Sequence, residues 1–153
     1  MGIKSFTGRR EKQPEEKVPL RVRDYMTRNL ITFHPDQHVE EVIDLLIRHK
    51  ISGGPVVNED RELVGILSEG DCIKHISDSR YYNMPPEQNR VSNCMVRDVE
   101  TIDGNLNIFD AAKKFLEAKR RRFPIVENGK LAGQISQKDI LKATVALRSQ
   151  RWK

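Results

Sequence analysis

The chain contains one short pattern twice, and this repetition constrains its fold more than any other feature. GILSEGD spans residues 65–71 and GQISQKD spans residues 133–139, and both read Gly-x-x-Ser-x-x-Asp. A constant offset of 69 also places Val22, Met26, Thr32, Val39 and Pro55 on Val91, Met95, Thr101, Ile108 and Pro124. One residue fewer in the loop after Asn58 reduces the offset to 68 at the motif. The chain is therefore an internal duplication of units of about 55 residues.

The first unit predicts the order strand, helix, strand, strand, helix. The apolar stretch 30–33 predicts a strand that ends before Pro35, and Asp36 is expected to cap a helix with apolar residues at helical spacing over 39–47. Gly53-Gly54 is expected to end that segment. Strands then follow at 55–57 and 63–67, and a helix that begins near Glu69 is expected to bury Cys72, Ile73 and Ile76.

The second unit predicts the same order of elements. Residues 99–102 form its first strand and 108–116 its first helix, and a last helix carries Ile140, Leu141 and Val145. The strands 123–126 and 131–135 are joined by Asn128-Gly129, a strong signal for a two-residue hairpin turn. Alternating helices and strands indicate a mixed α/β (α+β) fold. Neither unit has enough apolar surface for a stable domain, so the two are expected to pack as one body.

Composition predicts the organisation of the chain around the two units. The segments are a disordered N-terminal tail (1–17), repeat 1 (18–77), a linker (78–90), repeat 2 (91–147) and a basic C-terminal tail (148–153). The N-terminal tail is rich in charge and poor in apolar residues, so it cannot bury enough surface to fold. Ser, Asn, Gln and the pair Pro85-Pro86 mark the linker.

Composition also disfavours several classes of protein. No stretch approaches the roughly 20 apolar residues that cross a bilayer, and the N-terminus lacks a signal-peptide core, so we expect a cytoplasmic protein. Cys72 and Cys94 form no CxxC pair and have no His at zinc-ligand spacing, which indicates reduced thiols and no metal site. The four histidines share no motif with an acid or a Cys. Without a nucleophile, base or metal in a defined arrangement, we expect no enzyme.

The duplicated unit that ends in Gly-x-x-Ser-x-x-Asp resembles the CBS domain, named after cystathionine beta-synthase. YMTRNLITFHPDQHV and CMVRDVETIDGNLNI resemble the segments that lead into the family's domains, and HKISGGPVVNED and KRRRFPIVENG resemble its approach to the second strand. The resemblance covers residues 18–147 as a tandem pair, often called a Bateman module, arranged about a pseudo-twofold axis. It implies a regulatory module that needs no cofactor and forms a homodimer. Its signal would pass to an effector protein on another chain.

The resemblance also implies the ligand, which would be AMP, ADP or ATP, or else NAD or S-adenosylmethionine. The two Gly residues, which lack a Cβ, would let the ligand approach the strand closely. The Ser hydroxyl would bond a ribose or phosphate oxygen, and the Asp carboxylate would accept both ribose hydroxyls. The alternative is that Ser and Asp simply cap their helix, as they commonly do.

In related pairs each cleft joins the Ser and Asp of one repeat to strand residues of the other. Carried over by position, the first site would comprise Ile66, Ser68, Asp71, Val99, Glu100, Arg121, Arg122 and Pro124. The second site would comprise Leu30, Ile31, Ile51, Ser52, Pro55, Gln134, Ser136 and Asp139.

The two predicted sites differ in charge and polarity. Arg121 and Arg122 suit a phosphate through their forked donors, whereas the second site has only Ser52 and Gly53 there, with Lys138 nearby. Glu100 would repel an anion or pair with an arginine. Gln134 replaces the apolar Ile66, so the second site would hold adenine less well.

Two other functions remain open at this level. The net charge is +5, and basic residues gather near both ends of the chain, which would suit a nucleic-acid-binding protein. Such a protein would need aromatic residues among the basic ones, and only Phe6 and Trp152 qualify, so nucleic acid is the less favoured partner. The other alternative is a structural dimerisation module with degenerate pockets.

Overall fold

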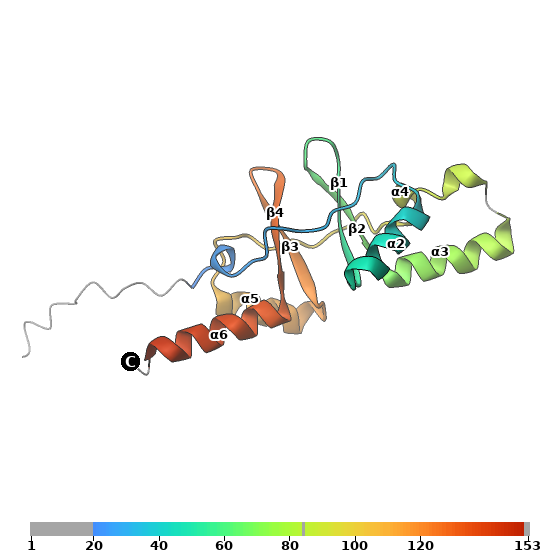
Figure 1. Cartoon of the computed structure of the whole chain (residues 1–153). Helices are drawn as coiled ribbons and strands as arrows, with labels where there is room; N and C mark the ends of the chain where they lie inside the picture. Colours follow the sequence, from blue (N-terminus) through green and yellow to red (C-terminus); the bar gives the residue numbers. More distant parts are fainter. Residues whose placement is uncertain (1–19, 84, 152–153) are drawn as a thin grey trace, which may run out of the picture.

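The two halves of the chain repeat one order of elements, which confirms the predicted mixed α/β class. The computed structural model describes residues 20–83 and 85–151, so the predicted N-terminal tail lies outside the described residues. The first half contains η1 (Val22–Asp24), α2 (Val39–His49), β1 (Gly53–Val57), β2 (Leu63–Ser68) and α3 (Glu69–Tyr82) (Figure 1). The second contains η2 (Pro86–Gln88), α4 (Val91–Cys94), α5 (Ile108–Ala118), β3 (Arg122–Glu127), β4 (Lys130–Ser136) and α6 (Gln137–Arg151). The last helices of the halves therefore continue into the segments assigned to the linker and the C-terminal tail.

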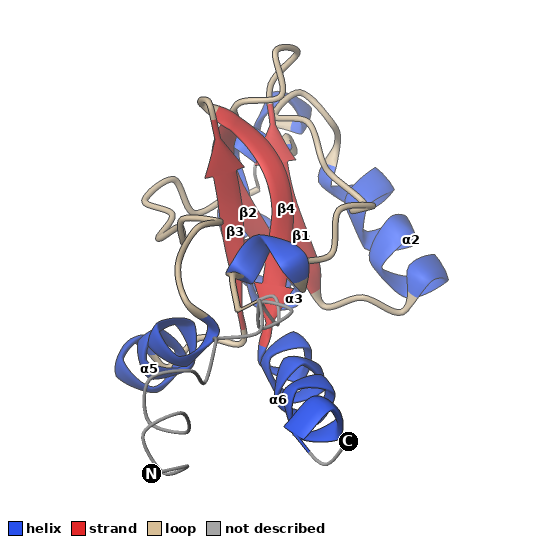
Figure 2. Ribbon diagram, turned by 90° about the vertical axis from the view of Figure 1, so that its left-hand side faces the viewer, coloured by secondary structure: helices blue, strands red, loops and turns tan. Residues whose placement is uncertain are grey.

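Each half contains one antiparallel hairpin, β1–β2 and β3–β4. The turn between β3 and β4 is the predicted one, because Asn128 and Gly129 both have positive φ (54° and 78°), as a type I′ turn requires. Figure 2 shows the four strands together at the centre of the molecule, with α5 and α6 at one end of them.

The predicted first strand of each repeat is reduced to a single parallel bridge, which joins Phe33 to Val56 and Ile102 to Ile125. Phe33 N donates to Pro55 O at 2.9 Å, and Ile102 N donates to Pro124 O at 3.1 Å. To extend each ladder toward the start of the predicted strand, the neighbouring hydrogen bond would need the N–H of the same proline, and proline has none. A proline in β1 and in β3 therefore prevents a longer first strand.

The first helix begins later than predicted. Its N-cap is His38 rather than Asp36, because residues 34–37 form a turn in which Gln37 N donates to His34 O at 3.1 Å. The N–H of Val39 donates to Asn89 O at 2.8 Å, so a residue of the other half satisfies this helix end. Gly53 and Gly54 belong to β1 and do not end the preceding segment as expected.

The segments that lead into the two repeats are exchanged between them. We call residues 21–27 and 90–96 the leading segments. Val22 and Met26 are buried in the core of the second repeat, while Val91 and Met95 are buried in the core of the first. Each hydrophobic core is therefore built from both halves.

Backbone pairs fix this exchange at equivalent positions. Thr27 pairs with Gln134 on β4, and Val96 pairs with Ile66 on β2, each through two hydrogen bonds of 2.8–3.0 Å. The reciprocal pairs relate the halves by the predicted pseudo-twofold axis and join them into one body.

The exchange corrects the explanation of the motif glycines. A Cβ on Gly65 would lie 2.6 Å from Met95 Sδ and 2.9 Å from Val96 O. A Cβ on Gly133 would lie 2.7 Å from Thr27 O and 2.9 Å from Met26 Sδ. What approaches these strands closely is thus the leading segment of the other repeat, not a ligand.

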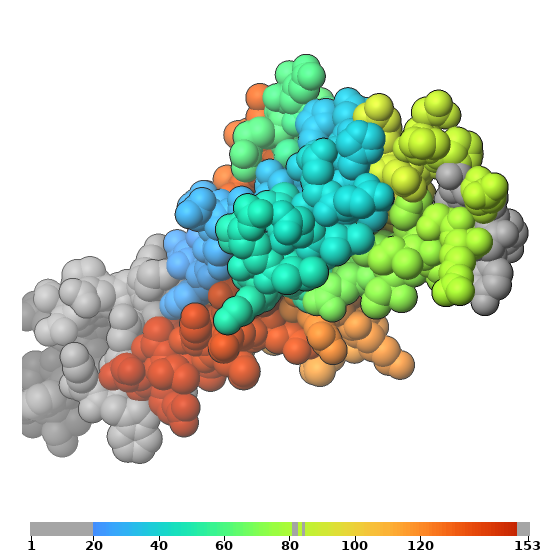
Figure 3. Space-filling view, turned by 45° about the vertical axis from the view of Figure 1, so that its right-hand side comes forward, coloured from blue at the N-terminus to red at the C-terminus, as the bar shows by residue number. Residues whose placement is uncertain are grey.

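The closing helices are less buried than their sequence pattern predicts. Cys72 is buried, but Ile73 and Ile76 are 65% and 54% exposed, and Leu141 and Val145 are also exposed. One face of α3 packs on α2 and β2, and the second apolar face has no cover within the described part of the molecule. No helix among the described residues is long and apolar enough to cross a membrane. Figure 3 shows the first repeat in space-filling form, with α2 and α3 on the face turned toward the viewer.

Candidate functional site

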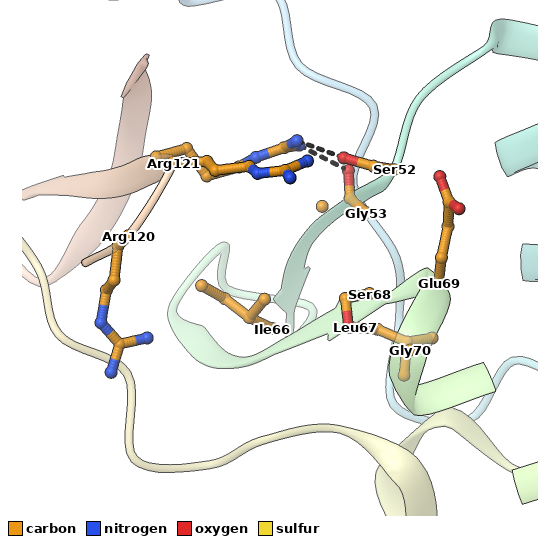
Figure 4. A pocket seen from close by; sticks show the side chains of 11 residues that line it. Ser52, Gly53, Ile66, Leu67, Ser68, Glu69, Gly70, Arg120 and Arg121 are labelled. Atoms are coloured by element: carbon orange, nitrogen blue, oxygen red, sulfur yellow. Dashed lines mark hydrogen bonds between the residues drawn. The ribbon is translucent and has the colours of Figure 1, made fainter. Parts of the chain in front are cut away.

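A cavity of about 400 Å³ lies between the two repeats. One wall comes from the start of β1, the end of β2 and the first turn of α3, and the other comes from the basic segment that enters β3 (Figure 4). The lining residues are Ser52, Gly53, Gly54, Ile66, Leu67, Ser68, Glu69, Gly70, Arg120, Arg121 and Arg122. The cavity therefore combines a helix N-terminus and three guanidinium groups with the single carboxylate of Glu69, and this excess of positive charge favours anions.

The motif Ser and Asp form a capping box at the start of each closing helix. Ser68 N and Ser68 Oγ both donate to Asp71 Oδ2 at 2.9 Å, and Asp71 N donates to Ser68 Oγ at 3.3 Å. Ser136 and Asp139 repeat these contacts at 2.8, 3.0 and 3.2 Å. The capping role is thus present in both copies. Within the described residues the bonds to each carboxylate converge on Oδ2, which leaves Oδ1 to other partners.

The three arginines of the cavity have different surroundings. Arg122 reaches from β3 into the first repeat, where it donates to Ser52 Oγ and, at 3.3 Å, to Gly53 O. Arg120 Nε lies 3.3 Å from Glu100 Oε2, so Glu100 pairs with an arginine, which is one of the two outcomes expected for it from the sequence. Arg121 is exposed, and Figure 4 shows it on the β3 side of the cavity, opposite Glu69.

The structure brings half of the predicted first site together. Ile66, Ser68, Arg121 and Arg122 line the cavity. Asp71 lies one hydrogen bond behind Ser68, and Glu100 faces Arg120. The other two residues lie outside the lining: Pro124 is buried within β3, and Val99 is half-buried in the stretch before the Ile102 bridge.

The residues of the predicted second site are divided among several places. Ser52 lines the first cavity, and Ile51 borders an apolar groove between α2 and α3. Gln134 is engaged with Thr27 through the backbone, and Pro55 is buried in β1. The remaining four are the capping pair Ser136 and Asp139 and the half-buried Leu30 and Ile31.

Sequence reasoning missed Gly54, Leu67, Glu69, Gly70 and Arg120 as lining residues, and it placed Gly53 beside Ser52 in the second site. The signal that Gly53 lies in this cavity was present, because Ser52 and Gly53 are equivalent by the offset of 69 to Arg121 and Arg122. Residues at equivalent positions meet across a twofold axis when they lie near it, and the Arg122 contacts are of this kind.

The two thiols lie away from the cavity, near the core of the first repeat. Both are free, with Cys72 buried and Cys94 partly buried. Burial raises the pKa of both thiols, and for Cys94 the neighbouring Cys72, Asp71 and Glu40 raise the pKa further, to about 11. Within the described residues no group of three or more His, Cys, Asp or Glu side chains could hold a metal ion.

Comparison with known proteins identifies the family. The CBS domain model matches residues 22–78 and 91–146. The inosine-5'-monophosphate dehydrogenase of Aquifex aeolicus is 34% identical over 135 residues, which are 86% of this chain and 26% of that enzyme. The chain spans 41% and 65% of the next two curated relatives.

Solved structures agree with this assignment. CBSX2 of Arabidopsis thaliana in complex with AMP is 27% identical, with a TM-score of 0.74 over 85% of this chain and 99% of that chain. The CBS domain pair of protein MJ0100 in complex with 5'-methylthioadenosine and S-adenosyl-L-methionine is 25% identical, with a TM-score of 0.67 over 81% of this chain and 98% of that chain. The duplication, the exchanged leading segments and these matches show that the chain belongs to the CBS domain family, as a tandem pair.

Proposed function

We propose that this chain is a regulatory module that binds an adenine nucleotide, or a related adenosyl ligand, in the cavity between its repeats. The observation that carries the proposal is the cavity itself, which Ser68 and Arg121 line from different repeats. Its volume of about 400 Å³ lies within the usual range for small-molecule sites. Relatives of known structure hold AMP, or 5'-methylthioadenosine and S-adenosyl-L-methionine.

Each part of such a ligand has a suitable partner in this proposal. Ile66 offers an apolar surface to the base. The hydroxyl of Ser68 and the second carboxylate oxygen of Asp71 accept hydrogen bonds from the ribose. Arg121 takes an anionic group, which favours phosphate-bearing ligands such as AMP, ADP, ATP or NAD over a cationic ligand. In this assignment the chain senses its ligand without catalysing a reaction.

The proposed output is an altered contact with other chains. Among the side chains that the structure describes, seven large apolar ones are exposed on the long helices α2, α3, α5 and α6, namely Ile47, Ile73, Ile76, Phe109, Leu116, Leu141 and Val145. A monomer rarely exposes large contiguous apolar surface, so we propose a homodimer that buries these residues and an effector protein that responds to the dimer. Light scattering should give twice 17.7 kDa at micromolar concentration. Ile73→Glu should favour the monomer, and a wild-type monomer would contradict the dimer.

Calorimetric titration of AMP and adenosine tests the binding proposal. Arg121→Gln should weaken AMP by about tenfold and leave adenosine unchanged, because it removes one of the guanidinium groups that contact the phosphate and none that contacts the nucleoside. Arg48→Gln is the matched control, since Arg48 pairs with Asp44 on the exposed face of α2. The measured stoichiometry reports whether the residues around Ser136 and Asp139 bind a second molecule.

The two capping boxes allow cap and ligand effects to be separated. Because the boxes are alike, Asp71→Ala and Asp139→Ala should each lower the free energy of unfolding by about 0.5–2 kcal/mol. Only Asp71→Ala should also weaken both AMP and adenosine in the first cavity, by about tenfold. If neither nucleoside nor nucleotide binds the wild-type protein, the sensor function is wrong, and the structural dimerisation module becomes the better hypothesis.

A further inference from the structure

The cavity contains a polar contact between the repeats that uses a second guanidinium group of its wall. Arg122, on β3, donates to Ser52 Oγ and to Gly53 O at the start of β1. Arg122 and Ser52 are both half-buried, and both line the cavity. The guanidinium therefore bonds neutral acceptors of the first repeat at the place where the proposed ligand would present its anionic group.

The acceptor side of this contact is held rigidly. Ser52 O accepts a hydrogen bond from Glu69 N at 2.9 Å, which ties Ser52 to the first turn of α3. Gly53 is paired with Ser68 in the hairpin, and a Cβ on Gly53 would lie 2.6 Å from Leu67 O, so the backbone there is closely packed. The backbone on the acceptor side therefore stays in place, and a rearrangement of the contact involves the side chains of Arg122 and Ser52.

A phosphate group is a stronger acceptor for a guanidinium than a hydroxyl or a peptide carbonyl. Charged partners roughly double the strength of a hydrogen bond, and arginine bonds phosphate through two parallel N–H groups. An anion in the cavity would thus draw Arg122 away from Ser52. A neutral ligand offers no such exchange and leaves the contact intact.

We propose that Ser52 competes internally for Arg122 and so determines how strongly the cavity discriminates phosphate-bearing ligands from neutral ones. The proposal rests on the function assigned above and names its specificity-determining residue. The second repeat has no equivalent contact to offer, because the counterpart of Arg122 in the first repeat is Gly53, which has no side chain to donate. Phosphate binding would release a bond between the repeats, whereas adenosine binding would keep it.

Removing the competing hydroxyl should strengthen phosphate binding. Ser52→Ala is expected to raise the affinity for AMP about fivefold, because Gly53 O still holds part of the guanidinium, and to leave adenosine affinity unchanged. Ser52→Thr restores a hydroxyl and should return the wild-type AMP affinity. Ser79→Ala is the matched control, since the Ser79 hydroxyl donates to Ile76 O on the exposed surface of α3.

A double-mutant cycle isolates the pair. In an Arg122→Gln background, Ser52→Ala should no longer change AMP affinity, because the group for which Ser52 competes is absent. Equal effects of Ser52→Ala with and without Arg122 would overturn the proposal. So would an unchanged ratio of AMP to adenosine affinity in Ser52→Ala.

Pyrophosphate separates this proposal from the sensor function, because it carries phosphate oxygens without a nucleoside. If pyrophosphate binds Ser52→Ala more tightly than the wild type while no nucleoside or nucleotide binds, the competition stands and the sensor function fails. If AMP binds wild type and Ser52→Ala equally, the sensor function stands and the competition fails. If neither AMP nor pyrophosphate binds any of the variants, both proposals are wrong.

Discussion

Gly65→Ala tests the exchange of leading segments directly. The new Cβ would lie 2.6 Å from Met95 Sδ and 2.9 Å from Val96 O, well below an ordinary contact of about 3.5–4.0 Å. The Met95 side chain can turn aside, but the Val96 carbonyl accepts from Ile66 N at 2.9 Å and cannot retreat without breaking the pair between the repeats. Backbone conformation is not involved, because Gly129 is the one described glycine with positive φ.

Overpacking of this kind costs about 1–3 kcal/mol. For a chain of this size, each kcal/mol lowers Tm by about 2–4 °C, so a loss of about 4–8 °C is expected at the middle of that range. Thermal and urea unfolding, followed by circular dichroism, measure both quantities.

Gly70→Ala is the matched control for this substitution. Gly70 lies in the first turn of α3, and a Cβ added to it would have Ser68 Oγ as its nearest neighbour, 3.7 Å away. An alanine there should raise stability by about 0.5–1 kcal/mol, as it does in other helices. A Gly65→Ala protein as stable as the wild type would refute the close approach of the leading segment, and with it the explanation of the motif glycine.

Two single residues give further predictions. Gly129→Ala should lower the free energy of unfolding by about 1–2 kcal/mol from backbone strain alone, because the φ of Gly129 is 78° and no atom lies within 4 Å of the added Cβ. Equilibrium unfolding measures this free energy. An unchanged free energy of unfolding would contradict the turn. Cys94, with its pKa raised from 9.0 to about 11, should react with iodoacetamide at pH 8 about a hundredfold more slowly than in urea, by mass spectrometry. Because the raised pKa means that the folded state retains the thiol proton, the contribution of this protonation to stability is complete below pH 9.0 and is lost as pH rises through 11. Equal labelling rates in the folded protein and in urea would contradict the raised pKa.

The local elements followed from the sequence because each depends on neighbouring residues. Asn128-Gly129 specified its hairpin turn, and the spacing of Ser68 and Asp71 specified a helix start. The duplication itself indicated a paired body. The predicted first strands were too long, since Pro55 and Pro124 remove a donor whose effect is visible only once the pairing partner is known.

Only the tertiary structure shows which repeat's core buries each leading segment. Apolar periodicity reports that Val22 and Val91 must be buried, but the two repeats offer nearly equivalent surfaces, so either core would satisfy either residue. The same ambiguity hid the partner of Arg122, whose acceptors lie 69 and 70 residues away in the chain. Sequence spacing describes contacts within a repeat. Contacts between repeats depend on how the leading segments cross, and that crossing placed Ser52 and Arg122 in one cavity.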